Sequence, residues 1–561
     1  MKRRQASEVK FLHWRFYLVV LLLLMATVGI LLRMIQLSVW QRDFLQSQGN
    51  ARSLRTLTLA AYRGLISDRN GHPLAISSPV DTIWANPQQV DLQQPKLAIL
   101  AKLLGGSTEK LIQQLSENQQ REFIYLKRHL SPELGQQILD LDIAGIHRLK
   151  EYRRYYPEGE STAHVVGFTN IDEQGQEGIE LTFNQLLQGT PGKQRVIKDR
   201  KGQIINVVED LLPPHPGTDI KLTIDHRIQY LAYHELKKAV EESQAEAGSL
   251  VMLDVQTGEI LAMANYPSYN PNRPVKKQDG RYRNRAVTDL FEPGSTIKGL
   301  SVANVLEQTH YTPESLMDTS PGWIVLNGRV VDDHQDNGEI SLTRVLARSS
   351  NVGMSKFILE TPANSLWELL HNLGFGEATG IDFPGEAHGV LTHHRVWAPF
   401  TLATLSFGYG LSSTNLQLAQ AYGVVAADGM KRPLTIVQRE GGARAEKQVL
   451  SPLTAQRVRV MLEAVVEKGG TGTRAQIKGY RVAGKTGTVR KVGRNGYEAK
   501  HHVGLFVGMV PADKPRIVTS VVIDDPKGKY YGGLVAAPVF AKVTAGGLRI
   551  LGIPPQMEVE K

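Results

Sequence analysis

Three short motifs combine a hydroxyl with an amine or an amide at spacings that suit acyl-transfer chemistry. In the first, Ser295 and Lys298 stand three residues apart, so on a helix both side chains share one face. Pro293 and Gly294 precede them and are typical of a turn, and Ser295 then opens a helix whose first backbone N–H groups can stabilise an oxyanion. The same positive helix end lowers a lysine pKa, so Lys298 is a candidate neutral base toward the serine.

The second motif supplies another hydroxyl and an amide two residues apart. Ser349 and Asn351 stand at the end of an amphipathic helical stretch that begins at Leu342. Taken alone, both motifs are weak, because S-x-x-K is expected by chance about once or twice in roughly this length of chain. Ser and Asn are also common at helix ends and turns. A helix cap followed by a surface lysine, and an ordinary turn, are the alternative interpretations.

The third motif, Lys485-Thr486-Gly487-Thr488, permits two interpretations. With the glycines before it, the motif matches G-x-x-x-x-G-K-[ST], a phosphate-binding loop that requires a helix directly after it. The residues that follow are instead typical of an extended strand and a turn. We therefore expect an exposed strand and no nucleotide. Lys485 and the hydroxyls of Thr486 and Thr488 are candidates to receive a substrate carboxylate there. Gly487 allows a ligand to approach the backbone closely.

Composition narrows the chemistry further. The 561-residue chain has no cysteine, which excludes disulfides, thiol nucleophiles and cysteine-ligated metal sites. His501 and His502 lack a third close ligand, so we expect no metal and interpret them as strand-end histidines. The net charge of +10 is mild for this length and requires no nucleic acid, since a phospholipid surface or an anionic wall polymer explains it as well.

Two other groups are weaker candidates. Tyr409, which stands between two glycines, is a candidate for the rim of a substrate cleft, with an ordinary core or surface aromatic as the alternative. Arg63, Asp68 and Arg69 have no nucleophile beside them in the sequence. We interpret them as a structural ion network, either buried or between domains.

The N-terminal segment is predicted to be a membrane anchor. Residues 16–32 carry no charge and no proline, and with the apolar residues that follow, 16–37 reaches the length of a transmembrane helix. Basic residues dominate 1–15, which predicts a cytoplasmic tail and export of the rest of the chain. A cleaved signal peptide is the alternative, although the apolar run is long for one and no small-x-small site follows closely.

The exported part divides at a proline-rich break, Pro213–Gly217, that neither a helix nor a central strand tolerates. We expect a polar stem at 38–54, a mixed domain at 55–217, a second domain at 218–555 and a tail at 556–561. In the mixed domain, strand-like Thr82–Trp84 and a helical stretch at 96–104 stand out.

The second domain is predicted to be α+β. Two apolar runs, 248–255 and 259–265, flank a short glycine turn and are typical of a β-hairpin, after a helical stretch at 225–242. Residues 503–509 and 517–523 are predicted strands, and 537–551 a closing helix. A single sheet assembled from both ends of the domain follows from this order.

The order and spacing of S-x-x-K, S-x-N and K-T-G make the set far more specific than its parts, and it resembles the penicillin-binding protein and serine β-lactamase superfamily. Stretches around and before the motifs are similar to class B penicillin-binding proteins in particular. They are 284–295, 469–473 and 506–511 near the motifs, and 63–71, 154–167 and 178–184 upstream. The short tail, single anchor and size most resemble the division-specific transpeptidases of Gram-negative bacteria, with the elongation-specific branch as second choice.

The resemblance implies a fold: a transpeptidase domain with a central antiparallel sheet and helices on both sides, an elongated mixed α/β pedestal, and one transmembrane helix in the inner membrane with the catalytic domain in the periplasm. It also implies a chemistry. Ser295 attacks a D-alanyl-D-alanine stem peptide and Lys298 takes its proton. Ser349 relays a proton to the leaving amine, and Asn351 binds the substrate amide. Lys485 with Thr486 or Thr488 holds the terminal carboxylate, and β-lactams acylate Ser295.

The resemblance further implies partners: peptidoglycan stem peptides, β-lactams as covalent inhibitors, the inner membrane, and division-complex proteins including a partner glycosyltransferase. No cofactor, nucleic acid or nucleotide is expected. A hydrolytic carboxypeptidase or β-lactamase, a non-catalytic penicillin-binding scaffold and a bifunctional glycosyltransferase are the rival functions. A hydrolase is disfavoured because the sequence has no separate deacylating carboxylate motif. A non-catalytic scaffold is disfavoured by the complete set of polar site residues. A bifunctional glycosyltransferase is disfavoured because a pedestal already accounts for the region before Gly217.

Overall fold

The computed structural model describes residues 13–45, 47, 54–198, 204–273, 280–438, 445–493 and 496–556. The chain forms two compact units. The first takes Met1–Ala61, Val80–Glu151 and Thr190–His215, and the second takes Tyr62–Pro79, Tyr152–Gly189 and Pro216–Lys561. The predicted domains 55–217 and 218–555 follow the order of the chain, whereas these units are interleaved along it, so those limits stay a prediction. Most of the two predicted tails and residues 46 and 48–53 of the predicted stem lie outside the described residues.

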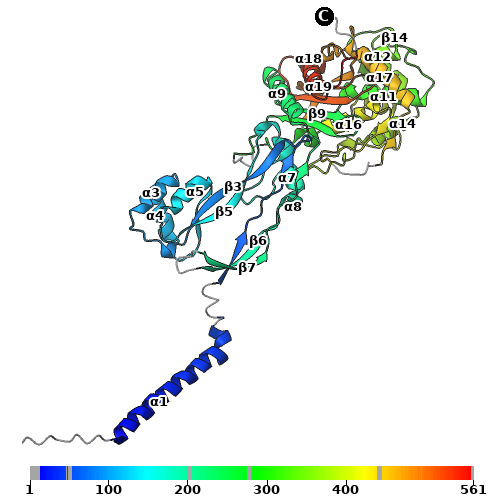
Figure 1. Ribbon diagram of the computed structural model, residues 1–561. Coiled ribbons are helices and arrows are strands. Elements are labelled where there is room, and N and C mark those ends of the chain that lie inside the picture. Colours follow the sequence, from blue (N-terminus) through cyan, green and yellow to red (C-terminus); the bar gives the residue numbers. More distant parts are fainter. Residues whose placement is uncertain are drawn as a thin grey trace, which may run out of the picture. The chain divides into compact units, whose positions relative to one another are not determined.

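The N-terminal helix α1, His13–Ile35, continues into a π-helical turn at Gln36–Trp40 (dark blue in Figure 1). Within them, the 27-residue apolar segment Trp14–Trp40 contains an 18-residue stretch with a mean hydropathy of 2.7 and no buried side chains. At 1.5 Å per residue this segment is long enough to cross a hydrocarbon layer of about 30 Å. The predicted span 16–37 lies inside it, and it is the one segment of this kind in the described part of the chain.

The first unit contains two layers of short elements. Residues 80–85 of β3 (Pro73–Ala85) pair with β4 (Ile124–Leu130), and helices α3 (Lys96–Leu103), α4 (Thr108–Glu117) and α5 (Pro132–Leu139) pack on these strands through a shared apolar core. The predicted strand at Thr82–Trp84 and helix near 96–104 are therefore confirmed. A separate antiparallel sheet joins β1 (Leu54–Leu59), β6 (Gly192–Lys198) and β7 (Ile204–Leu212).

A buried ion network holds the second unit together where its first segments meet. Arg63 Nε lies 2.5 Å from Glu180 Oε2, and Arg154 Nε lies 2.6 Å from Glu180 Oε1. All three side chains are at most 1% exposed. Arg63 also donates to Asn184 Oδ1 at 2.9 Å. The prediction that Arg63 belongs to a structural ion network is confirmed, and that network is buried.

The core of the second unit is a five-stranded antiparallel sheet. Its strands stand in the order β10-β9-β21-β20-β19, so strands from both ends of this part of the chain lie side by side. The predicted hairpin is confirmed as β9 and β10, and Gly258 in its turn has φ +73°, a conformation that favours glycine. The strands are β9 (Ala247–Asp254), β10 (Ile260–Tyr266), β19 (Ala483–Gly493), β20 (Gly496–Val510) and β21 (Ile517–Asp524).

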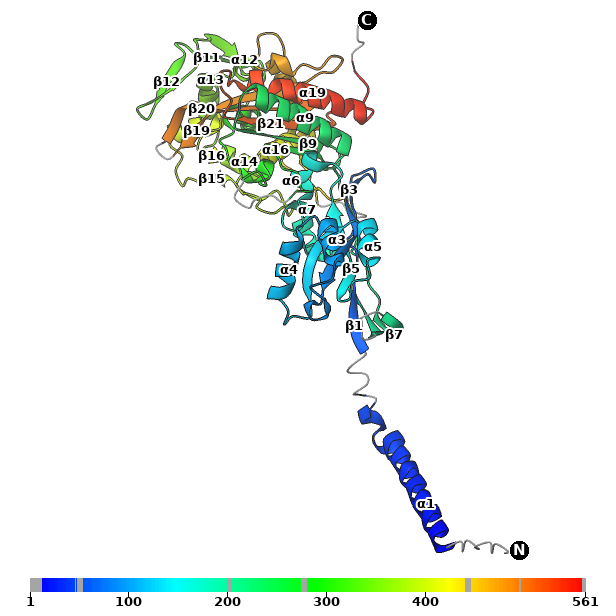
Figure 2. The ribbon, with the colours of Figure 1, turned by 90° about the vertical axis from the view of Figure 1, so that its left-hand side faces the viewer.

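Helices cover both faces of this sheet, as predicted. On one face α9 (His226–Glu242) and α19 (Ala537–Ile550) lie side by side (Figure 2). On the other face α11 (Lys298–Gln308), α16 (Asn415–Ala426) and α17 (Pro452–Val466) build the larger apolar core. Asp225 caps α9 by accepting a hydrogen bond from Arg227 N, which explains why the helix begins there.

The second unit contains further short helices and strands outside the central sheet. The helices are α6 (Ala163–Val166), α7 (Gly178–Thr182), α8 (Asn184–Leu187), α10 (Arg285–Thr288), α12 (Leu342–Arg348), α13 (Asn351–Ile358), α14 (Ser365–Leu373), α15 (Pro399–Ser406) and α18 (Gly532–Val535). Short paired strands are β11 (Leu316–Asp318) with β14 (Glu339–Ser341), β12 (Trp323–Leu326) with β13 (Arg329–Asp332), and β15 (Val390–Leu391) with β16 (Leu411–Ser412).

Candidate active site

Ser295 lies on a tight turn at the start of α11. Gly294–Ile297 form a single 3₁₀ turn, and the α-helix itself begins at Lys298. The prediction that Ser295 opens the α-helix is therefore corrected by one turn. Gly294 has φ +53°, and a Cβ there would lie 2.3 Å from Val489 Cγ1 of β19. The turn is thus pressed against the strand that carries the third motif, and only glycine fits at this position.

The second motif forms the joint between two helices. Ser349 ends α12 in the left-handed conformation, with φ 60° and ψ 38°. Ser350 caps α13, since its hydroxyl accepts a hydrogen bond from Gly353 N at 2.9 Å. Asn351 is the first residue of α13. A left-handed serine is uncommon, and such residues concentrate at functional sites.

Side chains from three remote stretches of the chain converge at this joint. Lys298 Nζ donates to Ser349 O at 2.5 Å, to Ser349 Oγ at 3.2 Å and to Asn351 Oδ1 at 2.7 Å. Lys485 Nζ donates to Ser349 Oγ at 3.1 Å and to Thr486 O at 3.2 Å. The structure therefore brings together four of the five side chains that the sequence singles out for catalysis. They are Lys298, Ser349, Asn351 and Lys485.

Ser295, the fifth, is partly exposed and lies one helical turn before Lys298. Among the described residues, no hydrogen bond joins its Oγ to Lys298 Nζ. The ammonium or amine of Lys298 already makes three contacts at the helix joint, which accounts for this. Hydrogen bonds between a nucleophile and its base are often long until a reactant is bound.

Burial shifts the pKa of both lysines downward. Lys298 and Lys485 are completely buried. Burial lowers the pKa of Lys298 well below its usual value; the charge of Lys485 lowers it further, and Asp333 acts in the opposite direction. Burial alone lowers the pKa of Lys485 to about 7. Two ammonium groups at one hydroxyl repel each other, so the site favours a neutral Lys298 beside a titrating Lys485.

Asp333 organises this site, and the sequence did not reveal it. Its carboxylate accepts hydrogen bonds from Ser350 Oγ at 2.5 Å, from Asn351 N at 2.5 Å and from Val352 N at 3.1 Å. It therefore satisfies the first free N–H groups of α13 and fixes the helix end that carries Asn351. No sequence signal marks Asp333, because it stands in a polar run whose composition is typical of a loop.

The third motif lies on a strand, β19, as predicted, but the expectation that the strand is exposed is wrong: Lys485, Thr486 and Gly487 are buried, because the turn that bears Ser295 packs against them. Thr486 Oγ1 is 2.7 Å from Thr471 Oγ1, and Thr488 Oγ1 accepts a hydrogen bond from Gly532 N at 3.0 Å. The strand continues to Gly493 and pairs with β20, so no helix follows the motif. This excludes the phosphate-binding loop, which needs a helix N-terminus for its phosphate.

Gly487 allows β19 to approach the turn that carries the nucleophile. A Cβ at this position would lie 2.9 Å from Thr296 Cγ2, 3.0 Å from Leu505 Cδ1 and 3.1 Å from Pro293 O. Such contacts are closer than side chains tolerate. Gly487 thus sets the spacing between the strand and the Ser295 turn.

Tyr409 is partly buried among other rings. Its ring centroid lies 5.8 Å from that of Phe407 and 5.9 Å from that of Tyr497. Glu292 accepts hydrogen bonds from Gly410 N at 3.0 Å and from Tyr497 Oη at 2.9 Å. Burial, followed by the charge of Glu292, raises the pKa of Tyr409. The sequence did not single out Glu292, which anchors this aromatic group two residues before Gly294.

In the part of the chain that the structure describes, one group has ligand atoms close enough for a metal: Asp68, Asp225 and His226. These atoms are engaged otherwise. His226 Nδ1 lies 2.7 Å from Asp68 Oδ2, and Arg227 Nη2 donates to Asp225 Oδ2 at 2.7 Å. His501 and His502 lie inside β20, not at a strand end as predicted, and His501 Nδ1 pairs with Asp525 Oδ2 at 2.8 Å.

The chain is similar to known proteins over nearly its whole length. Residues 248–545 match the penicillin binding protein transpeptidase domain, and residues 58–222 match the penicillin-binding protein dimerisation domain. The chain is 42% identical to the probable peptidoglycan D,D-transpeptidase PbpC of Pseudomonas aeruginosa over 97% of this chain and 96% of that protein. It is 41% identical to the peptidoglycan D,D-transpeptidase FtsI of Escherichia coli over 99% of this chain and 94% of that one.

A solved structure extends the likeness to the fold. The crystal structure of penicillin binding protein 3 from Mycobacterium tuberculosis, complexed with aztreonam, superposes with a TM-score of 0.70 at 27% identity, covering 90% of this chain and 99% of that one. Fold and site together define a serine-type transpeptidase with a dimerisation domain. The chain belongs to the class B penicillin-binding proteins.

Proposed function

We propose that this protein is a septal peptidoglycan D,D-transpeptidase that forms its acyl-enzyme on Ser295. The observation that carries the proposal is the convergence of Lys298 and Lys485 on Ser349, beside the turn that bears Ser295. The proposal also draws on the relatives named as D,D-transpeptidases, which align with nearly the whole chain.

In the first half-reaction, Ser295 Oγ attacks the carbonyl carbon of the penultimate D-alanine of a stem peptide. Lys298, buried and with a lowered pKa, accepts the serine proton. The tetrahedral oxyanion is held by the backbone N–H groups of Ser295 and Thr488. The C–N bond then breaks, and the leaving D-alanine amine takes a proton through Ser349, which both lysines contact.

In the second half-reaction, an amine of a neighbouring stem peptide attacks the ester carbonyl. That amine loses a proton to Lys298, the ester bond breaks, and Ser295 regains its hydroxyl. The net result is one new peptide cross-link and one released D-alanine.

The remaining site residues bind and orient the substrate. Lys485 and the hydroxyls of Thr486 and Thr488 hold the terminal carboxylate, and Asn351 binds the substrate amide. Tyr409 contributes to the rim of the cleft with the neighbouring rings. β-Lactams take the place of the stem peptide and acylate Ser295, leaving an ester that hydrolyses slowly. The aztreonam complex of the Mycobacterium tuberculosis protein supports this extension.

The apolar segment Trp14–Trp40 supports a single-pass membrane protein. The basic residues before it favour a cytoplasmic N-terminus, which would place the transpeptidase domain in the periplasm of a Gram-negative cell. Division-complex proteins, including a partner glycosyltransferase that supplies nascent glycan strands, are the proposed partners. A septal role predicts that depletion in cells yields filaments, whereas round cells would assign the protein to elongation.

The direct test is product analysis with the full chain in detergent. Nascent glycan strands with pentapeptide stems should yield cross-linked dimers and one D-alanine per cross-link. The Ser295→Ala variant should yield neither product. Release of D-alanine without any cross-link would instead assign the protein to the carboxypeptidases.

A further inference from the structure

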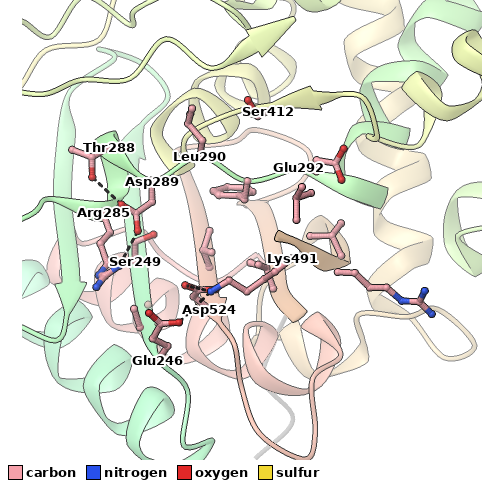
Figure 3. A pocket seen from close by; sticks show the side chains of 18 of the residues that line it. Glu246, Ser249, Arg285, Thr288, Asp289, Leu290, Glu292, Ser412, Lys491 and Asp524 are labelled. Carbon is pink, nitrogen blue, oxygen red and sulfur yellow. Dashed lines mark hydrogen bonds and ion pairs between the residues drawn. The ribbon is translucent and has the colours of Figure 1, made fainter. Parts of the chain in front are cut away.

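Two features of the protein take no part in the function proposed above. One is a pocket of about 730 Å³ in the second unit, where Lys491 pairs with Asp524 at 2.9 Å beside Glu246 (Figure 3). Four basic and four acidic side chains line this pocket, so it offers no unbalanced charge to a ligand. The other feature is the edge strand β7 of the first unit, which does indicate a partner.

Strand β7 exposes apolar side chains along its length. Four of its residues are between 38 and 49% exposed: Val207, Val208, Leu211 and Leu212. β7 is one edge of the three-stranded sheet β1-β6-β7, and the opposite edge strand, β1, exposes Thr56 and Thr58 instead. Threonine suits an edge strand in water, whereas a row of exposed valine and leucine marks a surface that associates with something apolar.

The irregular pairing of β7 narrows the kind of partner. Val208 and Leu211 are extra residues at two bulges of the β6–β7 pairing, so neither stands opposite a residue of β6. Bulges bend and twist an edge strand, which hinders a further strand from pairing with it in regular register. The bulge residues are nevertheless apolar and exposed. They therefore fit a partner that covers apolar side chains without imposing a register.

The hairpin that contains β7 is basic overall. Residues 190–215, which include β6 and β7, hold five basic and three acidic residues, a net charge of +2. On β6, Lys193 is exposed, and Arg195 Nη1 lies 3.2 Å from Glu209 Oε2 with both side chains 43–55% exposed. Apolar side chains beside exposed cations are typical of segments that lie in the headgroup region of an anionic membrane.

The chain itself keeps this sheet close to a membrane. β1 begins at Leu54, fourteen residues after Trp40, which is the last residue of the apolar segment. Fourteen residues span at most about 50 Å when fully extended. The sheet that contains β7 therefore stays near the bilayer in which the apolar segment is anchored. A tethered contact of this kind needs little intrinsic affinity, because the local concentration of lipid is high.

We propose that β7 lies on the membrane surface and inserts Val208 and Leu211 among the lipid headgroups and upper acyl chains. Lipid covers apolar side chains without requiring a register, and its anionic headgroups complement Lys193 and the other cations of the hairpin. The contact would orient the first unit on the bilayer. This inference goes beyond acyl transfer, and it rests on the membrane anchor that is part of the proposed function.

The test uses the absence of cysteine, since one introduced cysteine then carries the only fluorescent label on the chain. The full chain is placed in vesicles of equal parts phosphatidylcholine and phosphatidylglycerol, with a nitroxide on the upper acyl chains as quencher. A label at Val208→Cys should be quenched at least about twofold more strongly than one at Ile99→Cys. Ile99 is the matched control, because it is apolar, 51% exposed and part of the same unit. A label at Leu31→Cys reports the anchor.

A charge variant and the anchor label separate the outcomes. Adding Lys193→Glu to the Val208→Cys chain should lower the quenching in these vesicles and matter less in phosphatidylcholine alone. Thermal unfolding confirms that each labelled chain folds. If Leu31→Cys is quenched and Val208→Cys is quenched no more than Ile99→Cys, the proposal is overturned and β7 is left to a protein partner. Quenching at neither Leu31→Cys nor Val208→Cys would instead refute the anchor on which the inference rests.

Discussion

Lys298 and Lys485, 187 positions apart in the printed sequence, donate to the same oxygen: their Nζ atoms lie 3.2 and 3.1 Å from Ser349 Oγ. One hydroxyl cannot accept from two ammonium groups in a buried site without strong repulsion. The arrangement therefore favours a neutral Lys298, which accepts a hydrogen bond from the Ser349 hydroxyl and can act as the base, beside a protonated Lys485, which donates to Ser349 and can bind an anion.

The first prediction concerns pH. Acylation by a penicillin needs a neutral Lys298 and a protonated Lys485, so its second-order rate constant should follow a bell-shaped profile. The rate rises as pH passes upward through the lowered pKa of Lys298 and falls as Lys485 loses its proton near pH 7. Stopped-flow acylation over the whole pH range in which the protein stays folded, with buffers of constant ionic strength, measures the profile.

A guanidinium stays protonated throughout this range, so in Lys485→Arg the alkaline limb should disappear. An alkaline limb that is unchanged in this variant would show that another group is responsible.

The second prediction concerns Asp333. Replacing it by alanine leaves the first N–H groups of α13 without their acceptor and frees the residue that carries the substrate-binding amide, Asn351. We expect a loss of about 1–3 kcal/mol in the free energy of unfolding and a fall of about tenfold or more in acylation rate. Asp333→Asn retains an acceptor oxygen and should recover part of the stability. Wild-type acylation by Asp333→Ala would mean that the helix joint needs no such anchor.

The third prediction concerns the spacing between β19 and the nucleophile turn. In Gly487→Ala the new methyl group would meet Thr296 Cγ2 and Pro293 O, so the strand must move away from Ser295. Overpacking of this kind costs about 1–3 kcal/mol, and acylation should slow by about tenfold or more. Gly106→Ala is the control, because its new methyl group would meet no atom closer than 4.0 Å. Both variants are compared by thermal unfolding and by labelling with a fluorescent penicillin.

The fourth prediction concerns the buried ion network. Glu180→Gln removes the charge that balances Arg63 and Arg154, both of which stay buried. Leaving uncompensated buried charges costs about 3–5 kcal/mol. Limited proteolysis and the midpoint of thermal unfolding should both report a marked loss of stability. Lys238→Met, which removes an exposed i,i+4 pair with Glu242, should change little. Equal midpoints for the two variants would argue against a structural role for Glu180.

Much of the transpeptidase fold was predictable because its signals are local. The apolar runs on either side of Gly258 indicate a hairpin, and the glycine-rich continuation after Lys485 indicates a strand and not a helix. The three motifs fall on a helix start, a helix joint and a strand, as their residue types suggest. That the three motifs meet in one site was expected from the resemblance to penicillin-binding proteins, and not from local signals.

Other parts depend on long-range packing and left no local signal. Ser349 takes its left-handed conformation because α12 and α13 meet there at a tight joint. Asp333, which caps α13, precedes that helix by a separate strand and helix in the chain, so no local pattern indicates the contact. Glu292 is one more case, since its partners Gly410 and Tyr497 lie more than a hundred positions away.

Intact mass spectrometry of the full chain after penicillin treatment, followed by peptide mapping, tests most directly whether Ser295 is the nucleophile. We expect one added penicillin mass, located on the peptide that contains Ser295 and absent in Ser295→Ala. An adduct that persists in Ser295→Ala, or one that maps to another residue, would contradict the claim that this serine is the nucleophile.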